Sequence, residues 1–311
     1  MLEEVKMDVE LAKMAEIDEA LKDEETAHIM IDRNRVISRR DVKGLVVETY
    51  EREDGVDVKL KVLKGSVIKK PIHMCFGITH EKTMQRIKMD IEIEDGAQAS
   101  FLSHCILPKS GVRHEMEAAI YIGENAKYSY EEKHIHAFDA KVEVVSKAKV
   151  RVGKKGVFKT DFELIRGRVG ILEIDYEAAG DEKSIIEMTT RVSGREDDII
   201  KVKETGYLKG EGAKGALATR IAVRQRARAE IYNKMVATAA YARGHVDCKE
   251  IIQDKGEAMA IPVVEVKHPR AHVTHEAAIG SVDKKQLETL MARGLSEDEA
   301  VELIIEGMLG A

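Results

Sequence analysis

The sequence predicts an all-β core folded as a β-solenoid, with helical segments at both ends of the chain. Three observations lead to this fold class. Polar and apolar residues alternate in short runs, turns that contain glycine recur at nearly constant spacing, and aromatic residues are few. We therefore expect an N-terminal helical segment at 1–35, a β-solenoid core at 36–280 and a C-terminal helical region at 281–311.

The segment at the start of the chain has the pattern of an amphipathic helix. Leu11, Met14, Ile17 and Leu21 recur at spacings of three and four residues, with charged residues between them. A helix of this kind packs on its own domain or contacts a partner, and the first interpretation is the more common.

Short runs in the next region alternate between apolar and polar residues. Because successive side chains of a strand point to opposite faces, each run is expected to form a strand with one buried face. Few helix-period stretches and only four prolines interrupt the pattern, which indicates an all-β architecture. The clearest runs are 56–62, 87–93, 142–144, 150–152 and 200–202.

Turns with glycine divide these runs at a regular interval. A nearly constant period with two or more strands per period is typical of stacked coils, whereas a β-sandwich has shorter and less even spacing. The chain has no Trp, eight Tyr and five Phe, so aliphatic side chains must fill the coils. The turn glycines, spaced by 27, 30, 27 and 30 residues, are Gly96, Gly123, Gly153, Gly180 and Gly210.

Two short amphipathic helices are expected at the C-terminal end. The first ends at Gly294, and the second begins at Ser296 with Glu299 three residues later, which is a capping box. These helices either cap the solenoid or offer an apolar surface to another protein, and both interpretations stay open here. Their apolar positions are Leu287, Leu290, Met291, Ala300, Val301, Ile304, Ile305 and Met308.

Charge and composition exclude several classes of protein. The 311 residues carry 50 Lys and Arg against 56 Asp and Glu, a net charge of −6, which argues against a general nucleic-acid binder. No apolar run of about 18 residues and no secretory leader are visible. Three cysteines cannot form a disulfide framework and favour a reducing compartment such as the cytoplasm. No nucleotide-binding or hydrolase motif occurs.

Side chains that bind metals gather near the end of the β region. Thiolate, imidazole and carboxylate are the ligand types of iron, zinc and iron–sulfur clusters, and residues one coil apart lie side by side in a solenoid. Alternatively, the cysteine is a small buried hydrophobe and the histidines are surface groups. The residues are Cys248, His268, His272, His275 and Glu276.

Other reactive residues have simpler interpretations. Cys75 and Cys105 are expected to be core thiols because apolar residues surround both. His134 and His136 share one face of a strand and are interpreted as surface residues. Four alternating arginines are expected on the solvent-exposed face of one strand, and they are Arg220, Arg224, Arg226 and Arg228.

Four motifs in the last part of the chain are specific. They are DCKEII at 247–252, AIPVVEVK at 260–267, AHVTHEA at 271–277 and MARGLSEDEA at 291–300. Together these motifs resemble the SufB/SufD family of iron–sulfur cluster assembly proteins. The resemblance is strong over the last 70 residues or so and rests on pattern alone in the rest of the β region.

The resemblance implies a right-handed parallel β-helix that pairs with a copy of itself or with a SufB or SufD paralogue. It implies a scaffold for the SUF system, not an enzyme. A transient iron–sulfur cluster would be built at the dimer interface with sulfur from a donor and passed to apo-proteins. It also implies that a SufC-like ABC ATPase docks on the C-terminal helices. The expected contact residues are Leu287, Leu290, Met291, Leu295, Ile304 and Ile305.

The resemblance also assigns site residues. Cys248 and Glu276 match cluster or sulfur-handling positions of SufB, and His275 matches such a position of SufD. All three are therefore expected to bind the cluster metal. The long N-terminal part of SufB with its cysteine motif is absent from this sequence, so its route of sulfur entry is not expected. The alternative is a structural or polysaccharide-active β-solenoid without metal function.

Overall fold

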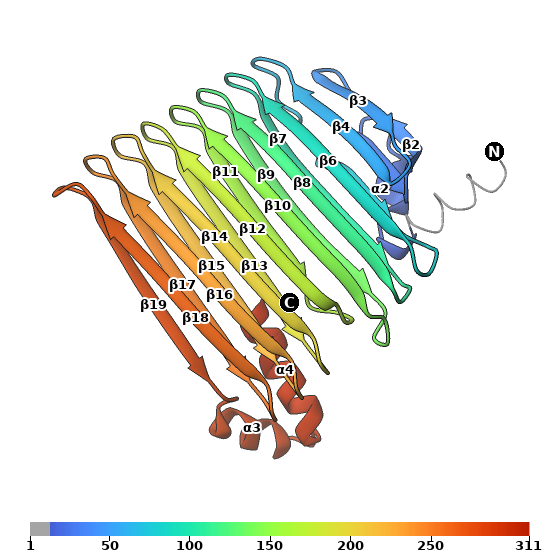
Figure 1. Cartoon of the computed structure of the whole chain (residues 1–311), viewed down its shortest axis with the longest axis vertical. Helices are drawn as coiled ribbons and strands as arrows, with labels where there is room; N and C mark the ends of the chain where they lie inside the picture. Colours follow the sequence, from blue (N-terminus) through green and yellow to red (C-terminus); the bar gives the residue numbers. More distant parts are fainter. Residues whose placement is uncertain (1–12, 311) are drawn as a thin grey trace.

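The computed structural model describes residues 13–310, and its β region is a solenoid of two β-sheets with the core between them (Figure 1). From β4 onward, successive strands alternate between the sheets, so each coil adds one strand to a ten-stranded sheet, called sheet A, and one to a nine-stranded sheet, called sheet B. Strands of neighbouring coils pair in parallel, except that β1–β2 and β3–β4 are antiparallel. The predicted all-β solenoid is confirmed.

The order of strands in each sheet follows the stacking of the coils. Sheet A contains, in spatial order, β2 (Arg35–Arg40), β1 (His28–Asp32), β5 (Ile72–Gly77), β7 (Gln98–Leu107), β9 (Lys127–His136), β11 (Val157–Leu164), β13 (Ile185–Gly194), β15 (Lys214–Val223), β17 (Arg243–Ile252) and β19 (His272–Gly280). Sheet B contains β3 (Leu45–Glu51), β4 (Gly55–Val62), β6 (Met84–Ile93), β8 (Val112–Ile122), β10 (Val142–Val152), β12 (Gly170–Gly180), β14 (Ile199–Leu208), β16 (Arg228–Ala237) and β18 (Glu257–Val266).

Residues 13–310 form three helices outside the sheets. They are α2 (Asp18–Lys22), α3 (Lys284–Met291) and α4 (Glu297–Leu309). None of the helices formed by residues 13–310 combines the length and the apolar composition that crossing a lipid bilayer requires.

The sequence periods correspond to the coils. The runs at 142–144 and 150–152 both belong to β10. Each residue of β10 pairs with a residue of β12 about one coil later in the sequence, as Val142 does with Gly170. Glycine allows the turns of neighbouring coils to stack closely. A Cβ on Gly210 would lie 1.9 Å from the backbone nitrogen of Glu182 in the preceding coil. Gly96 has a φ of +69°, which other residues rarely adopt.

The inward-facing residues of both sheets form one continuous core. Burial alternates residue by residue along most strands, as period two requires, and the buried side chains are mainly Val, Ile, Leu and Met. The few aromatic residues stack on one another: the rings of Phe101, Tyr128 and Phe158 follow at centroid distances of 5.1 and 5.7 Å. The composition predicted this largely aliphatic interior.

Sheet A begins earlier than the predicted boundary at residue 36. All five residues of β1 are buried, because the N-terminal segment covers its outer face. A strand buried on both faces shows no alternation of polar and apolar residues, so the period-two pattern does not reveal β1. Leu11 lies outside the described residues. The covering cluster contains Ala15, Ile17, Met30, Cys75 and Ile106, with Met14, Leu21, Ile37 and Ile135 at its margin.

The C-terminal helices follow the last strand and return to sheet A (Figure 1). Both predicted ends are present: Gly294 has a φ of +99°, and Ser296 forms a capping box with Glu299. Helix α4 buries Val301 and Ile305 against Ile165 of the solenoid, whereas α3 buries none of its residues. Of the two interpretations, packing on the solenoid therefore holds for α4.

The four alternating arginines do not share one strand face. Arg220 lies in β15, where its guanidinium pairs with Asp247, and Arg228 begins β16. The residues between these strands form a coil turn, from which Arg224 reaches Glu302 of α4 at 2.6 Å. The prediction was wrong because a turn interrupts the run that was taken for one strand.

Candidate functional site

Cys248 lies on the inner face of β17, the last strand of sheet A with a neighbour on each side. It is fully buried, and its register partners are Thr219 in β15 and Ala277 in β19. The thiol is therefore held inside the solenoid, one strand away from its C-terminal end.

The interior around Cys248 is polar, unlike most of the core. The side-chain amide of Asn233 donates towards the Cys248 sulfur at 3.6 Å and to the Thr219 hydroxyl. Glu250, two residues further along the same strand face, is 2% exposed, and neither of its carboxylate oxygens has a hydrogen-bond partner within residues 13–310. Glu204 accepts a hydrogen bond from Thr190 with one oxygen only.

Burial dominates the protonation of these groups. It raises the pKa of the Cys248 thiol to about 11, and the negative charge of Glu250 acts in the same direction. Burial likewise raises the pKa values of Glu250 and Glu204 to about 7. Near neutral pH, Cys248 carries its proton and the two carboxyl groups titrate. A bound metal ion would favour the thiolate of Cys248.

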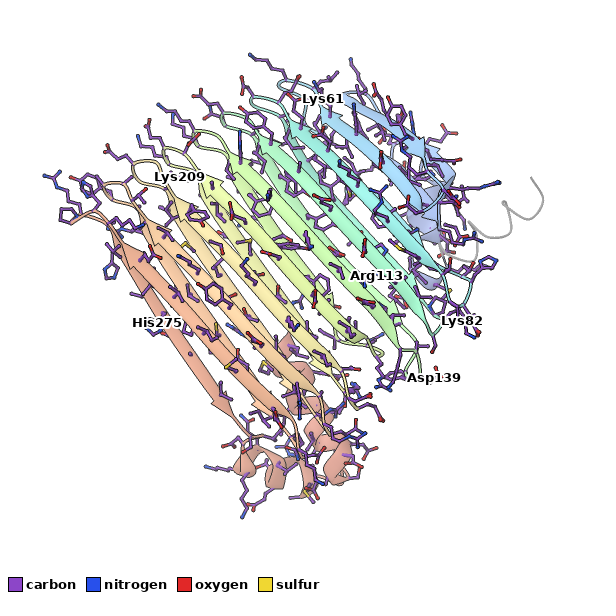
Figure 2. All side chains as sticks on the ribbon, in the orientation of Figure 1. Lys61, Lys82, Arg113, Asp139, Lys209 and His275 are labelled. Carbon is purple, nitrogen blue, oxygen red and sulfur yellow. The ribbon has the colours of Figure 1, made fainter. Side chains whose placement is uncertain are left out.

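The other two predicted site residues lie on the exposed edge strand β19 (Figure 2). His275 pairs in register with Val246 and so lies on the inner face, as Cys248 does. Glu276 pairs with Asp247 and lies on the outer face. The fold thus brings Cys248 and His275 to one face of sheet A and puts Glu276 on the other. His268 and His272 are also exposed or half-buried, in the turn before β19 and at its start.

The C-terminal end of the solenoid is uncovered. In β17, the inward-facing Val246 and Glu250 are buried, but Ile279, the partner of Glu250 in β19, is 45% exposed. The same change occurs in sheet B, where Ala237 of β16 is buried and its partner Val266 of β18 is 48% exposed. Core positions in the last coil therefore face solvent, next to an edge of unpaired backbone groups.

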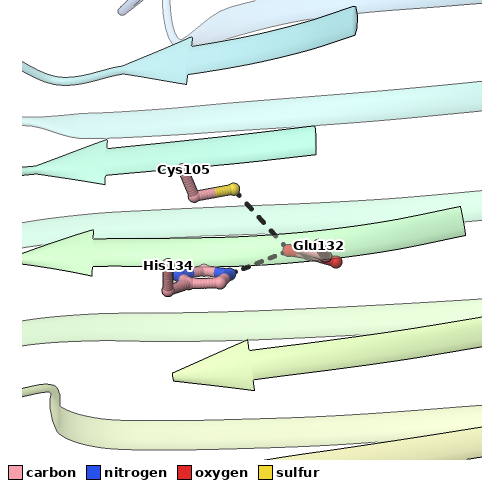
Figure 3. A group of neighbouring side chains, drawn as sticks. All are labelled: Cys105, Glu132 and His134. Atoms are coloured by element: carbon pink, nitrogen blue, oxygen red, sulfur yellow. Dashed lines mark hydrogen bonds and ion pairs between the residues drawn. The ribbon is translucent and has the colours of Figure 1, made fainter. Parts of the chain in front are cut away.

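A second polar group lies inside the solenoid, and Figure 3 shows three of its members. Strands β11, β13 and β15 separate this group from β17. The Cys105 sulfur on β7 lies 3.6 Å from a carboxylate oxygen of Glu132 on β9, and the same oxygen lies 2.8 Å from Nε2 of His134. The Cys105 sulfur is also 3.8 Å from Nε2 of His114 on β8. Cys75 and Cys105 are both buried, as predicted.

The prediction that His134 and His136 are surface residues was wrong. Their exposed fractions are 3% and 6%, and they are hydrogen-bonded to each other inside the solenoid. Ile135 between them packs on the outer face, beneath the N-terminal segment. Because the N-terminal segment covers the outer face here, the apolar Ile135 points outward and the two histidines point into the solenoid. One sequence signal did exist: Cys105 and His134 are 29 residues apart, one coil period, and pair in register.

Helices α3 and α4 leave an open groove of about 610 Å³ between them. Among the predicted contact residues, Leu290 and Ile304 line the groove, and Met291 is 41% exposed beside it. Leu287 and Leu295 are half-buried, whereas Ile305 is buried against the solenoid. The full lining is Asp283, Lys285, Gln286, Thr289, Leu290, Leu303 and Ile304.

Comparison with known proteins gives the same family as the motifs. The sequence model described as "SUF system FeS cluster assembly, SufBD core domain" matches residues 76–308. The chain belongs to the SufBD family. As a SufBD protein it is 41% identical, over 96% of its length and 98% of the relative's, to an iron–sulfur cluster assembly SufBD family protein of Methanocaldococcus jannaschii. A family protein of Pyrococcus horikoshii is 33% identical over 97% of this chain and 92% of its own.

Similarity to a bacterial SufB is confined to a shorter stretch. The iron–sulfur cluster assembly protein SufB of Bacillus subtilis is 38% identical over 69 residues, 22% of this SufBD chain and 15% of the bacterial protein. The similarity to the Methanocaldococcus jannaschii and Pyrococcus horikoshii proteins named above, in contrast, extends over nearly the whole SufBD chain. The family thus establishes a role in iron–sulfur cluster assembly.

Proposed function

We propose that this SufBD protein is a non-enzymatic scaffold on which an iron–sulfur cluster is assembled, with Cys248 as its sulfur ligand. The observation that carries the proposal is the position of Cys248, a buried thiol one strand from the uncovered end of the solenoid. The carboxylates of Glu204 and Glu250 near it have oxygens without a hydrogen-bond partner among residues 13–310, and oxygen is an acceptable ligand for iron. One thiolate with nitrogen and oxygen ligands holds a cluster less tightly than four thiolates, which suits its release.

The proton of Cys248 must leave before the sulfur can bind iron. Glu250 lies on the same strand face, and its pKa of about 7 lets it take up a proton near neutral pH. We assign Glu250 this proton-accepting role. The cluster is cargo in this scheme, and the chain supplies the thiol, the proton acceptor and the shelter from solvent.

We further propose that two copies, or one copy and a paralogue, meet at the uncovered coil. The exposed core positions of β18 and β19 and the unpaired edges would be buried by a second solenoid end. His275 of each subunit would then lie towards the two Cys248 thiols, while Glu276 would lie at the interface on the outer face of sheet A. In this arrangement His275 extends the inner face on which Cys248 lies.

The C-terminal region, residues 281–311, is proposed to dock a SufC-like ABC ATPase. The groove between α3 and α4 offers Leu290 and Leu303 to a partner, while Ile305 and the ion pairs of Glu302 with Arg195 and Arg224 hold α4 to sheet A. A pull exerted on α4 would reach β15 and the turn before β16 directly. This connection gives nucleotide binding on the ATPase a route to the solenoid.

Anaerobic reconstitution with ferrous iron and sulfide tests the role of Cys248. After desalting, we expect Cys248→Ala to retain about tenfold less iron and sulfide per chain than the wild type. His275→Ala and Glu276→Ala should give intermediate retention. Cys75→Ala is the matched control, since Cys75 is also a buried thiol but lies in an apolar cluster. Equal cluster content in Cys248→Ala and the wild type would remove Cys248 as the ligand.

Charged substitutions in the groove test the docking surface. Leu290→Asp combined with Leu303→Asp is expected to raise the Kd for the SufC-like ATPase at least about tenfold, because apolar contacts are lost at the groove centre. The measurement is titration calorimetry with the purified ATPase. Tyr121→Asp with Ile199→Asp, two exposed apolar residues of sheet B, is the control. Unchanged affinity in the groove variant would place the ATPase elsewhere.

A further inference from the structure

The polar group of β7, β8 and β9 has the ligand set of a metal site. It comprises a thiol, a carboxylate and two imidazoles, and among residues 13–310 only Cys105, Glu132 and His134 form a group of three such residues with ligand atoms within 4.8 Å of one another. His114 lies outside that group, but its Nε2 atom is 3.8 Å from the Cys105 sulfur, so a shift of the ring would make it a fourth ligand. All four side chains are nearly or wholly buried.

Two spacings at the Cys105 sulfur are close to those of a tetrahedral site. With metal bonds of about 2.3 Å to sulfur and about 2.0–2.1 Å to nitrogen and oxygen, tetrahedral neighbours lie about 3.4–3.6 Å apart. The Cys105 sulfur is 3.6 Å from Glu132 and 3.8 Å from His114. The 2.8 Å contact between Glu132 and His134 needs to lengthen only by the small rotation that admits an ion.

The hydrogen bonds of the histidines direct a lone pair at this position. Nδ1 of His136 lies 2.9 Å from the backbone carbonyl of Arg168, so it must carry the proton of that ring. In a neutral His136, Nε2 is then an acceptor, and Nδ1 of His134, at 3.2 Å, must donate to it. The proton of a neutral His134 is thereby fixed on Nδ1. Its Nε2 presents a lone pair to the Glu132 carboxylate, and a cation between them satisfies both.

The charge balance of the site favours the same cation. Within residues 13–310, no Lys or Arg side chain forms an ion pair with Glu132, which is 1% exposed. The second oxygen of Glu132 and Nδ1 of His114 have no hydrogen-bond partner in the described part of the chain. Buried groups of this kind are costly unless they are paired or bind a metal.

We propose that Cys105, His114, Glu132 and His134 bind one divalent transition-metal ion in a tetrahedral site inside the solenoid, with zinc as the best match. Its ligands would come from three consecutive strands, β7, β8 and β9, and would tie sheet A to sheet B. This ion is structural and separate from the cluster cargo, since β11, β13 and β15 lie between the site and Cys248. The inference does not depend on the proposed function.

Cobalt provides a spectroscopic test, because a thiolate bound to Co²⁺ gives a near-ultraviolet charge-transfer band. The full chain is produced in cobalt-supplemented medium, so that a buried site loads during folding, and is purified without oxygen. In the variant Cys75→Ser/Cys248→Ser, Cys105 is the remaining thiol of the chain. We expect about one Co²⁺ per chain and the charge-transfer band in this variant, and loss of the band after the further change Cys105→Ser.

Further variants separate metal binding from folding. Glu132→Gln and His114→Gln keep the size of the side chain and are expected to lower the cobalt content about tenfold or more. The wild type and Cys248→Ser should both hold the ion, although Cys248→Ser loses the cluster. A folded Cys75→Ser/Cys248→Ser protein without cobalt would overturn the proposal. Equal cobalt content with and without Cys105, or in Glu132→Gln, would overturn it as well. If the double variant does not fold, the same comparison between Cys248→Ser and Cys248→Ser/Glu132→Gln decides the matter.

Discussion

Replacing Glu204 with glutamine is expected to stabilise the protein at pH 8 far more than at pH 5. Burial raises the pKa of Glu204 to about 7 from an ordinary value of 4.5, so the folded state resists its ionisation. Below pH 4.5 the carboxyl group is neutral whether the chain is folded or unfolded, and it costs nothing. As the pH rises from 4.5 to 7, the wild type progressively loses stability, and the loss is complete above pH 7.

The expected size follows from the two pKa values. The free energy of unfolding of Glu204→Gln, relative to the wild type, should rise by roughly 2 to 3 kcal/mol between pH 5 and pH 8. The amide oxygen of glutamine still accepts the hydrogen bond from Thr190, so the change removes the charge and keeps the contact. Any cost of the amide nitrogen is the same at each pH and cancels in the difference.

Urea unfolding at several pH values measures this effect. Glu230→Gln is the matched control, because Glu230 is an exposed residue of the neighbouring strand β16. The control should follow the wild type at every pH. Parallel stability curves for Glu204→Gln and the wild type would show that the interior carboxyl group is not held neutral by burial. A buried carboxylate near Cys248 that lowers the stability of the fold is consistent with a binding site for a metal ion, because functional sites often reduce stability.

The fold could be predicted because the solenoid repeats one local pattern. Period two marked the strands β4, β6, β10 and β14, and glycine spacing gave the length of a coil. Prediction failed where a second layer covers the outer face. At β1 and around Ile135, side chains are buried on both faces of the strand. The alternation of polar and apolar residues therefore does not show which face points into the solenoid.

The candidate site could be predicted only in part, for a related reason. Motifs identified Cys248, but its neighbour Asn233 lies 15 residues earlier, half a coil away on the other sheet. Residues one full coil apart pair in a fixed register, as Thr219 and Cys248 do. Residues half a coil apart meet at positions set by the turn lengths on either side, which no sequence period reveals. The burial of Glu250 could not be predicted, because charged side chains usually face solvent.

Lysine substitutions at the uncovered end are expected to convert the proposed dimer into a monomer. Val266 and Ile279 extend the inner faces of sheets B and A beyond the last covered coil, with exposed fractions of 48% and 45%. In the proposed assembly a second solenoid end buries both side chains. Two lysines per subunit would meet two more across the interface, and their desolvation and mutual repulsion oppose association.

Light scattering at micromolar concentration gives the mass of each species. We expect the wild type at twice the chain mass of 34.7 kDa and Val266→Lys/Ile279→Lys at the single mass, with cluster retention reduced as in Cys248→Ala. Ile171→Lys/Ile199→Lys adds the same charge at exposed apolar positions in the middle of sheet B and should stay dimeric. A dimer that survives in the end variant would move the interface to another face. A monomer that still retains the cluster would separate assembly from cluster binding, because Cys248 would then need no ligand from a second subunit.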